Sequence, residues 1–278
     1  MSNWTRITAA FIGALLFGGC AAAAQNLAPK SQKERDALVA IQSAPDADAK
    51  LKAIDDMLGS FPDTAYKTIL LDMAVGIAQE KGDYPLTIAW AERDLEANPK
   101  SFVSMLAIST STAANTKEFD LDKTEKLDKA EKYAKEALDT VKTAPKPAQV
   151  SDDKWPEAQK YFESGAHAAL AMVDVDRKKY DEAIAEYKTA VDLYPDAASM
   201  VRLGDTYVKA GKYDDAIATF DKVIALPDVA PGIKRFAENS KNNVLKKKGP
   251  GPAAAAPAAP AAPSAPAATP APAPATNK

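Results

Sequence analysis

Apolar side chains recur at helical spacing over most of the chain, and short breaks divide them into segments. Residues 197–230 show this pattern clearly. Met200 and Leu203 fall on one face of a first predicted helix, Gly211 marks a break, and a second amphipathic helix ends before Pro227. Apolar positions three and four residues apart are typical of a helix that buries one face. The pattern therefore predicts a helix–turn–helix unit of about 34 residues.

The unit is repeated along the chain. Residues 179–184, which read KYDEAI, recur 33 positions later as residues 212–217, which read KYDDAI. Tyr187 stands where Phe220 stands in the later unit, and Pro195 closes the earlier one. A fixed period of this size is typical of proteins in which each unit covers the apolar face of its neighbour.

The residues of these two units resemble the tetratricopeptide repeat family. Its signature is a large residue, a Leu-Gly pair, a Tyr, a small residue in the second helix, an aromatic residue and a closing Pro. The family's Trp position holds Met200 in the last unit and His167 in the unit before, and Pro227 comes one residue early. The resemblance implies an all-α fold, an α-solenoid of tandem helix–turn–helix repeats. The signature residues of the last unit are Leu203, Gly204, Tyr207, Gly211, Tyr213, Ala216 and Phe220.

The same pattern divides the rest of the chain. Residues 25–66 predict a degenerate helix pair, and residues 68–248 predict the solenoid. The turn of the second unit is about nine residues longer, around residues 115–124. We expect residues 144–156, which contain three prolines, to form a loop between the second and third units. The expected repeats are 68–101, 102–144, 164–196 and 197–230, followed by a cap helix over residues 232–248.

Residues 249–278 have a composition of their own, almost only Ala and Pro. Such a segment cannot bury enough apolar surface to offset the entropy lost on ordering. Frequent prolines also exclude a helix. We expect a disordered tail of polyproline II character.

The first residues have the order of an export signal. Arg6 precedes an apolar run of thirteen residues, Ile7–Gly19, and small residues follow. The run is shorter than the about 20 residues that span a bilayer. Two kinds of processing remain open. Either residues 1–24 are removed as an ordinary signal peptide, or residues 1–19 are removed and Cys20 is lipidated. Both kinds of processing predict a periplasmic or envelope-associated bacterial protein. Contact with a membrane is expected only if Cys20 carries a lipid.

Charge and residue counts exclude several kinds of chemistry. Lys and Arg number 35 against 38 Asp and Glu, so no basic excess predicts a nucleic-acid partner. The single Cys and single His exclude an intrachain disulfide and a Cys/His zinc site. Phosphate-binding loops, nucleophile elbows and zinc-protease motifs are absent. We therefore expect no cofactor, no metal and no catalytic residue, and we interpret His167 as a packing residue.

The resemblance also implies where a partner binds. Solenoids of this family have an extended concave face lined mainly by first helices, and peptides or helices bind there. Members that hold chaperone C-termini carry a Lys and Asn clamp. The matching places here hold Val201 with Asp205 and Ala168 with Met172, so chaperone docking is disfavoured. The groove positions that the family's pattern implies are Asp72, Gln79, Met172, Asp176, Val201, Asp205 and Lys209.

Two hypotheses of function follow. The first is a non-enzymatic scaffold in the bacterial cell envelope that binds a protein or peptide partner in its concave groove. The alternative is an envelope-assembly or wall-associated lipoprotein with a structural role, anchored through Cys20. A hydrolase acting on wall or glycan is disfavoured, because no spacing singles out a catalytic pair among the many carboxylates.

Overall fold

The computed structural model describes residues 28–146 and 150–248, which form eleven α-helices. The predicted all-α fold of packed helical repeats is confirmed. The expected export signal, Cys20 and the Ala/Pro tail lie outside the described residues. The helices are α2 (Gln32–Ser43), α3 (Ala47–Ser60), α4 (Lys67–Lys81), α5 (Tyr84–Ala97), α6 (Phe102–Asn115), α7 (Lys123–Thr143), α8 (Trp155–Asp176), α9 (Tyr180–Leu193), α10 (Ala197–Lys209), α11 (Tyr213–Ala225) and α12 (Pro231–Lys248).

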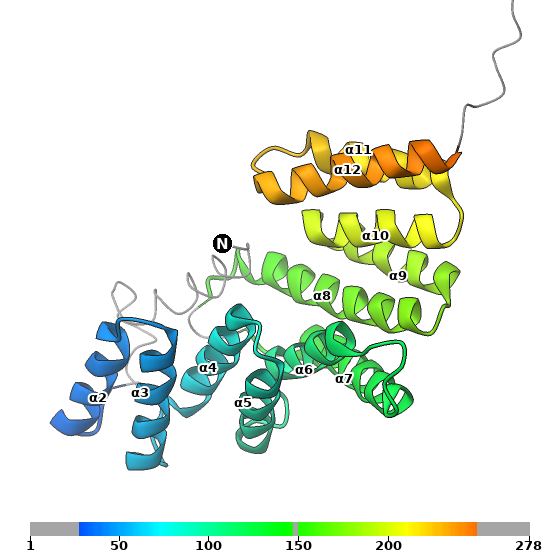
Figure 1. The fold of residues 1–278 in the computed structure, drawn as a ribbon. Helices are drawn as coiled ribbons and strands as arrows, with labels where there is room; N and C mark the ends of the chain where they lie inside the picture. The colour runs from blue at the N-terminus through cyan, green and yellow to red at the C-terminus, as the bar shows by residue number, and fades with distance from the viewer. Residues whose placement is uncertain (1–27, 147–149, 249–278) are drawn as a thin grey trace, which may run out of the picture.

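The helices follow one another in a curved array, with α2 and α3 at one end and α10 to α12 at the other (Figure 1). Each helix packs against the next one in the chain. Four hairpins, α4–α5, α6–α7, α8–α9 and α10–α11, form its body, and α12 packs on α11. We call α4, α6, α8 and α10 the first helices. None of the described helices has the length and apolarity needed to cross a bilayer.

Small side chains on one helix receive an aromatic ring from its partner. Ala171 of α8 and Tyr187 of α9 are both buried in one apolar cluster. Gly204 of α10 and Phe220 of α11 make the corresponding contact in the next hairpin. Close packing of this kind excludes water, and a buried aromatic side chain contributes about 1.5–3 kcal/mol to folding.

The tight turns inside the hairpins need left-handed backbone. Gly82 ends α4 with φ 67°, and Gly211 follows α10 with φ 74°. Glycine adopts this conformation without steric penalty. In the α8–α9 turn the corresponding residue is Lys178, with φ 62°. The chain therefore places a charged side chain where the neighbouring turns have none.

Polar contacts tie neighbouring units together. Arg177, at the end of α8, binds Asp128 at 2.5 Å and also Glu131, both on α7. At the other end of the array, Thr64 donates a hydrogen bond at 2.6 Å to the buried Glu34 of α2. This bond joins the start of α2 to the segment that precedes α4, so the N-terminal pair is packed as part of the same body.

The interpretation of residues 144–156 as a loop was wrong at its C-terminal end. Helix α8 begins at Trp155, so it starts nine residues before the expected repeat at 164. Pro156 lies in the first turn of the helix, where proline is tolerated because no hydrogen bond to its nitrogen is needed. Trp155 and Phe162 are buried against α6 and α7, and this packing accounts for the longer helix.

Candidate protein-binding groove

The first helices line an open groove of about 950 Å³. Helices α6 and α8 contribute more of its lining than any other helices, and the α9–α10 and α11–α12 loops also line it. Gln79 of α4 and Tyr84 of α5 lie at the other end. The groove therefore spans several repeats, as an extended ligand requires.

The floor of the groove has small side chains. Gly165 and Ala168 of α8 line it beside Leu106 of α6. A Cβ atom added to Gly165 would meet only Leu106 Cδ1, at 3.8 Å, which is ordinary van der Waals contact. The backbone of a bound peptide can therefore approach α8 closely, and a larger side chain at residue 165 has room to enter the groove.

Aromatic rings form one wall of the groove. Tyr161 makes edge contacts with Phe162 and Tyr194, with ring centroids 5.4 and 5.1 Å apart. Phe102 packs against Phe162 at 4.9 Å. Such edge-to-face pairs hold the rings in fixed positions. Burial raises the pKa of the Tyr161 hydroxyl, so this group is uncharged at neutral pH. The wall offers flat apolar surface with polar edges, which suits a peptide.

Few charged groups line the groove. Arg202 of α10 is the basic residue of the lining. Burial raises the pKa of Tyr187 to about 12, and the nearby Arg202 guanidinium opposes part of that rise. Asp196 caps α10 by accepting the N–H groups of Ala198 and Ser199. Gln79 Oε1 is buried and accepts no hydrogen bond from any described residue. An unsatisfied buried acceptor of this kind is costly for folding.

The structure separates the groove positions that were expected from the family's pattern. Gln79 and Met172 line the groove. Val201 instead packs against the core cluster around Phe220. Asp72 is drawn into a contact with Asp94 of α5. The expectation placed all of these side chains on the concave face, yet only the first two are among the residues that line it.

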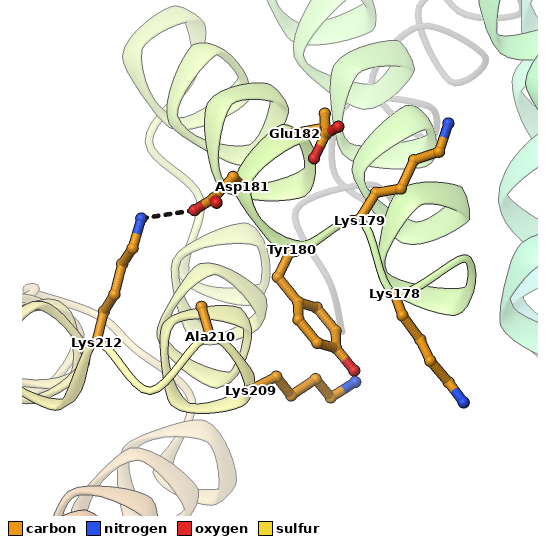
Figure 2. Close-up of a pocket in the computed structure, with 8 residues that line it drawn as sticks. All are labelled: Lys178, Lys179, Tyr180, Asp181, Glu182, Lys209, Ala210 and Lys212. Carbon is orange, nitrogen blue, oxygen red and sulfur yellow. Dashed lines mark hydrogen bonds and ion pairs between the residues drawn. The ribbon is translucent and has the colours of Figure 1, made fainter.

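Asp176, Asp205 and Lys209 lie near one another toward the C-terminal ends of α8 and α10. Burial raises the pKa of both carboxyls, and the charge of Lys209 opposes the rise in each case. Lys209 lines a second, smaller cleft between the α8–α9 and α10–α11 turns (Figure 2). These three residues therefore belong to the edge of the array formed by the turns.

The partly buried Asp72 and the fully buried Asp94 form a carboxyl pair. Burial, and then the facing Asp94, raise the pKa of Asp72 well above its usual range. Ser101 donates to Asp72 at 3.3 Å, and Ser104 donates to Asp94 Oδ2 at 2.6 Å. Asp94 Oδ1 is buried and accepts no hydrogen bond from the described residues. Burial also raises the pKa of Asp94, so ionisation of both carboxyls inside the fold is unfavourable.

Sequence reasoning missed the groove residues Tyr161, Tyr194, Gly165 and Arg202. Tyr161 lies in the part of α8 that was interpreted as preceding the repeat. Tyr194 lies in a loop whose approach to the groove depends on the curvature of the array. Only Gly165 left a local signal, as a helical glycine next to Ser164 in an otherwise apolar segment.

The described residues offer little for metal or acid–base chemistry. No group of three or more His, Cys, Asp or Glu side chains among them is placed to hold a metal ion. His167 Nδ1 lies 2.6 Å from Glu186 Oε2, between α8 and α9. This contact joins the two helices of one hairpin, and His167 does not line the groove.

The comparisons agree with this geometry. Residues 168–231 match the model of the tetratricopeptide repeat family. They cover α9, α10, α11 and most of the turns that bound the smaller cleft. No match is found among curated proteins.

Solved structures of similar fold are known. A thermophilic TPR protein of Thermus thermophilus, TTC0263, is 16% identical with a TM-score of 0.54, over 74% of this chain and 98% of that chain. Residues 41 to the end of MamA from Desulfovibrio magneticus RS-1 are 17% identical with a TM-score of 0.45, over 70% of this chain and 94% of that chain. At these identities the similarity concerns the fold alone.

Proposed function

We propose that this protein is a non-enzymatic scaffold that binds an extended segment of a protein partner in the concave groove. The repeat family of residues 168–231 supports this role, because such repeats generally bind proteins. The observation that carries the proposal is the groove itself, which is open, nearly uncharged, and floored by small side chains of α6 and α8. No catalytic family matches, and the groove holds no pair of groups placed for acid–base chemistry.

The lining favours a particular kind of segment. Tyr161 and Tyr194 offer ring edges to apolar side chains. With Gly165 on the floor, the ligand backbone has room to lie along α8. A peptide that is extended, mostly apolar and of low charge fits these features.

We propose that the scaffold acts in the bacterial cell envelope. The support is the apolar run of residues 7–19 behind Arg6, which has the order of an export signal. The body would then consist of residues 25–66 and 68–248, followed by the Ala/Pro-rich residues 249–278. A membrane would be reached only through a lipid on Cys20.

The alternative function is an envelope-assembly or wall-associated lipoprotein with a structural role. Cys20 supports it, since the only Cys of the chain directly follows the apolar run. Palmitate labelling and detergent fractionation of the wild type and of Cys20→Ser test it. Label that is lost in Cys20→Ser supports an anchor, whereas an intact mass that begins at Gln25 rejects it.

A groove-blocking variant tests the scaffold. Peptides that bind the full chain are selected by display, and their Kd is measured by fluorescence polarisation against the wild type, Gly165→Leu and Gly165→Ala. We expect Gly165→Leu to weaken binding about tenfold or more, since it fills the floor, and Gly165→Ala to change Kd by less than about threefold. Equal affinity for all three proteins rejects the groove as the binding site.

A further inference from the structure

The loop between α6 and α7 exposes two large apolar side chains. Phe119 is 93% exposed and Leu121 is 107% exposed, whereas the next most exposed large apolar residue in the described chain, Val39, is 53% exposed. The loop is the turn of the second repeat, and it is longer than the turns inside the other hairpins. Side chains that contribute nothing to the core are available for another molecule.

Ion pairs join this loop to α7 and to the α8–α9 turn. Asp120 accepts a hydrogen bond from the backbone N–H of Lys117 at 3.1 Å and binds Lys126 at 2.9 Å. Glu118 binds Lys123 at 2.6 Å and Lys178 of the α8–α9 turn at 2.7 Å. These contacts bracket Phe119 on both sides. The two apolar side chains are therefore presented by an ordered segment, which reduces the entropy lost on binding.

Lys178 connects the loop to the smaller cleft, which has a volume of about 510 Å³. Four lysines and two carboxylates line it, although the whole chain has a net charge of −3. Lys212 binds Asp181 at 2.7 Å. Figure 2 shows these side chains around Tyr180. Lys179 and Lys209 make no ion pair with the described residues within 4 Å, although their charges partly offset the rise in pKa that burial causes, that of Lys179 at Asp174 and that of Lys209 at Asp176 and Asp205.

The backbone of Lys178 supports a role for this charge. Its φ of 62° is left-handed, and Gly211 meets the same requirement in the next turn without a side chain. A left-handed conformation is unfavourable for any residue with a Cβ atom. The side chain that this conformation carries is the one that pairs with Glu118 of the long turn.

We propose that this outer edge is a second docking surface, which binds an acidic protein segment that carries large apolar side chains. We call it the lysine edge and define it by Phe119, Leu121, Lys178, Lys179 and Lys209. Carboxylates of the segment would lie against the lysines of the cleft, and its apolar side chains against Phe119 and Leu121. The argument for this partner is charge complementarity beside exposed apolar surface. The lysine edge and the concave groove share no lining residue.

A designed peptide probes the lysine edge. A labelled peptide of about twelve residues made of Glu-Leu-Glu-Phe units is titrated with the full chain at low and high salt. Matched peptides replace Glu by Lys, or Leu and Phe by Ser. We expect the acidic apolar peptide alone to bind, with a Kd that rises with salt because the contact is partly ionic.

Paired variants locate the binding. Lys179→Glu with Lys209→Glu is expected to raise Kd about tenfold or more, and the milder double change to Ala to raise it less. Phe119→Ser with Leu121→Ser should also raise Kd by about tenfold, without loss of folding, since both side chains are exposed. The controls are Lys188→Glu with Lys222→Glu, which makes the same charge change on exposed positions elsewhere, and Val39→Ser.

Four results would overturn the proposal. The first is that the peptide does not bind at up to about 1 mM, and the second is that edge and control variants lose affinity for it equally. The third is that only Gly165→Leu loses affinity for the peptide. The fourth is that phosphatidylglycerol vesicles bind in a way that depends on Phe119, while the peptide does not bind. The third result would place the peptide in the concave groove. The groove and the lysine edge are thereby tested separately, because each has its own variants.

Discussion

The ring of Phe220 lies directly against the α-carbon of Gly204, where α10 and α11 cross. A Cβ atom built on Gly204 would lie 2.6 Å from Phe220 Cε1 and 2.8 Å from Cζ, closer than real contacts allow. Phe220 is fully buried, so its ring cannot swing out of the way. The absence of a side chain at residue 204 therefore sets the spacing of the two helices.

Gly204→Ala is expected to lower the free energy of unfolding by about 1–3 kcal/mol, because overpacking forces the helices apart. Gly165→Ala is the matched control. It also replaces a glycine inside a first helix, but its Cβ has room, so we expect a gain of about 0.5–1 kcal/mol from helix propensity. Urea unfolding of the two variants checks the contrast, and equal shifts would contradict the packing argument.

The hairpin turns give a second pair of opposite changes. Gly211→Ala should lower the free energy of unfolding by about 1 kcal/mol, because it places a Cβ in left-handed backbone with φ 74°. Lys178→Gly relieves the same penalty and loses one exposed ion pair worth at most about 1 kcal/mol. We therefore expect Lys178→Gly to be no less stable than the wild type. Thermal unfolding of both variants checks this contrast. A lower unfolding temperature in both would show that the left-handed backbone of the turns does not determine their stability.

The Asp72–Asp94 pair predicts that stability falls as pH rises. The folded pKa of both carboxyls lies above the unfolded value of about 3.9, so the pair contributes stability that is full below about pH 4 and lost as pH rises through the folded pKa values. Asp72→Asn removes the repulsion. Relative to wild type, it should gain stability between pH 5 and pH 8 in urea unfolding. The exposed Asp139→Asn is the control, and parallel profiles for both variants would refute the coupling.

Glu34 predicts the opposite dependence. The hydrogen bond from Thr64 is the main cause that lowers the pKa of Glu34. The contact therefore contributes stability above the unfolded pKa of about 4.3, which is lost as pH falls through the folded pKa. Thr64→Val should cost about 1–3 kcal/mol at pH 7 and less at pH 3, because the buried carboxylate loses its donor. Thr189→Val, at an exposed site on α9, should show no such dependence.

Much of the fold could be predicted from local spacing. The repeated segments at 179–184 and 212–217, the breaks at Gly82 and Gly211, and the period of 33 residues all reflect interactions within one hairpin. A helix that buries one face records that face in its own sequence, because the spacing of its apolar residues follows the helical period. For the same reason the long turn after Asn115 was visible as extra residues.

The start of α8 could not be predicted in this way. Pro156 is equally compatible with a loop and with the first turn of a helix. Trp155 and Phe162 decide between the two only because α6 and α7 are there to receive them. The distinction depends on packing between units, which no window of the sequence contains.

For the candidate sites, too, some features follow from local spacing and others from packing between units. The spacing of apolar residues was enough to predict that first helices repeat, since helical period and repeat period are local properties. The groove positions of Gln79 and Met172 stay a prediction about partner binding. Only the tertiary structure turned Asp72 toward Asp94 and gathered Asp176, Asp205 and Lys209 at the turns. It alone also joined Glu118 to Lys178, 60 residues apart, at 2.7 Å. Such contacts depend on how far each hairpin is rotated on the last, and many packed side chains together set that rotation.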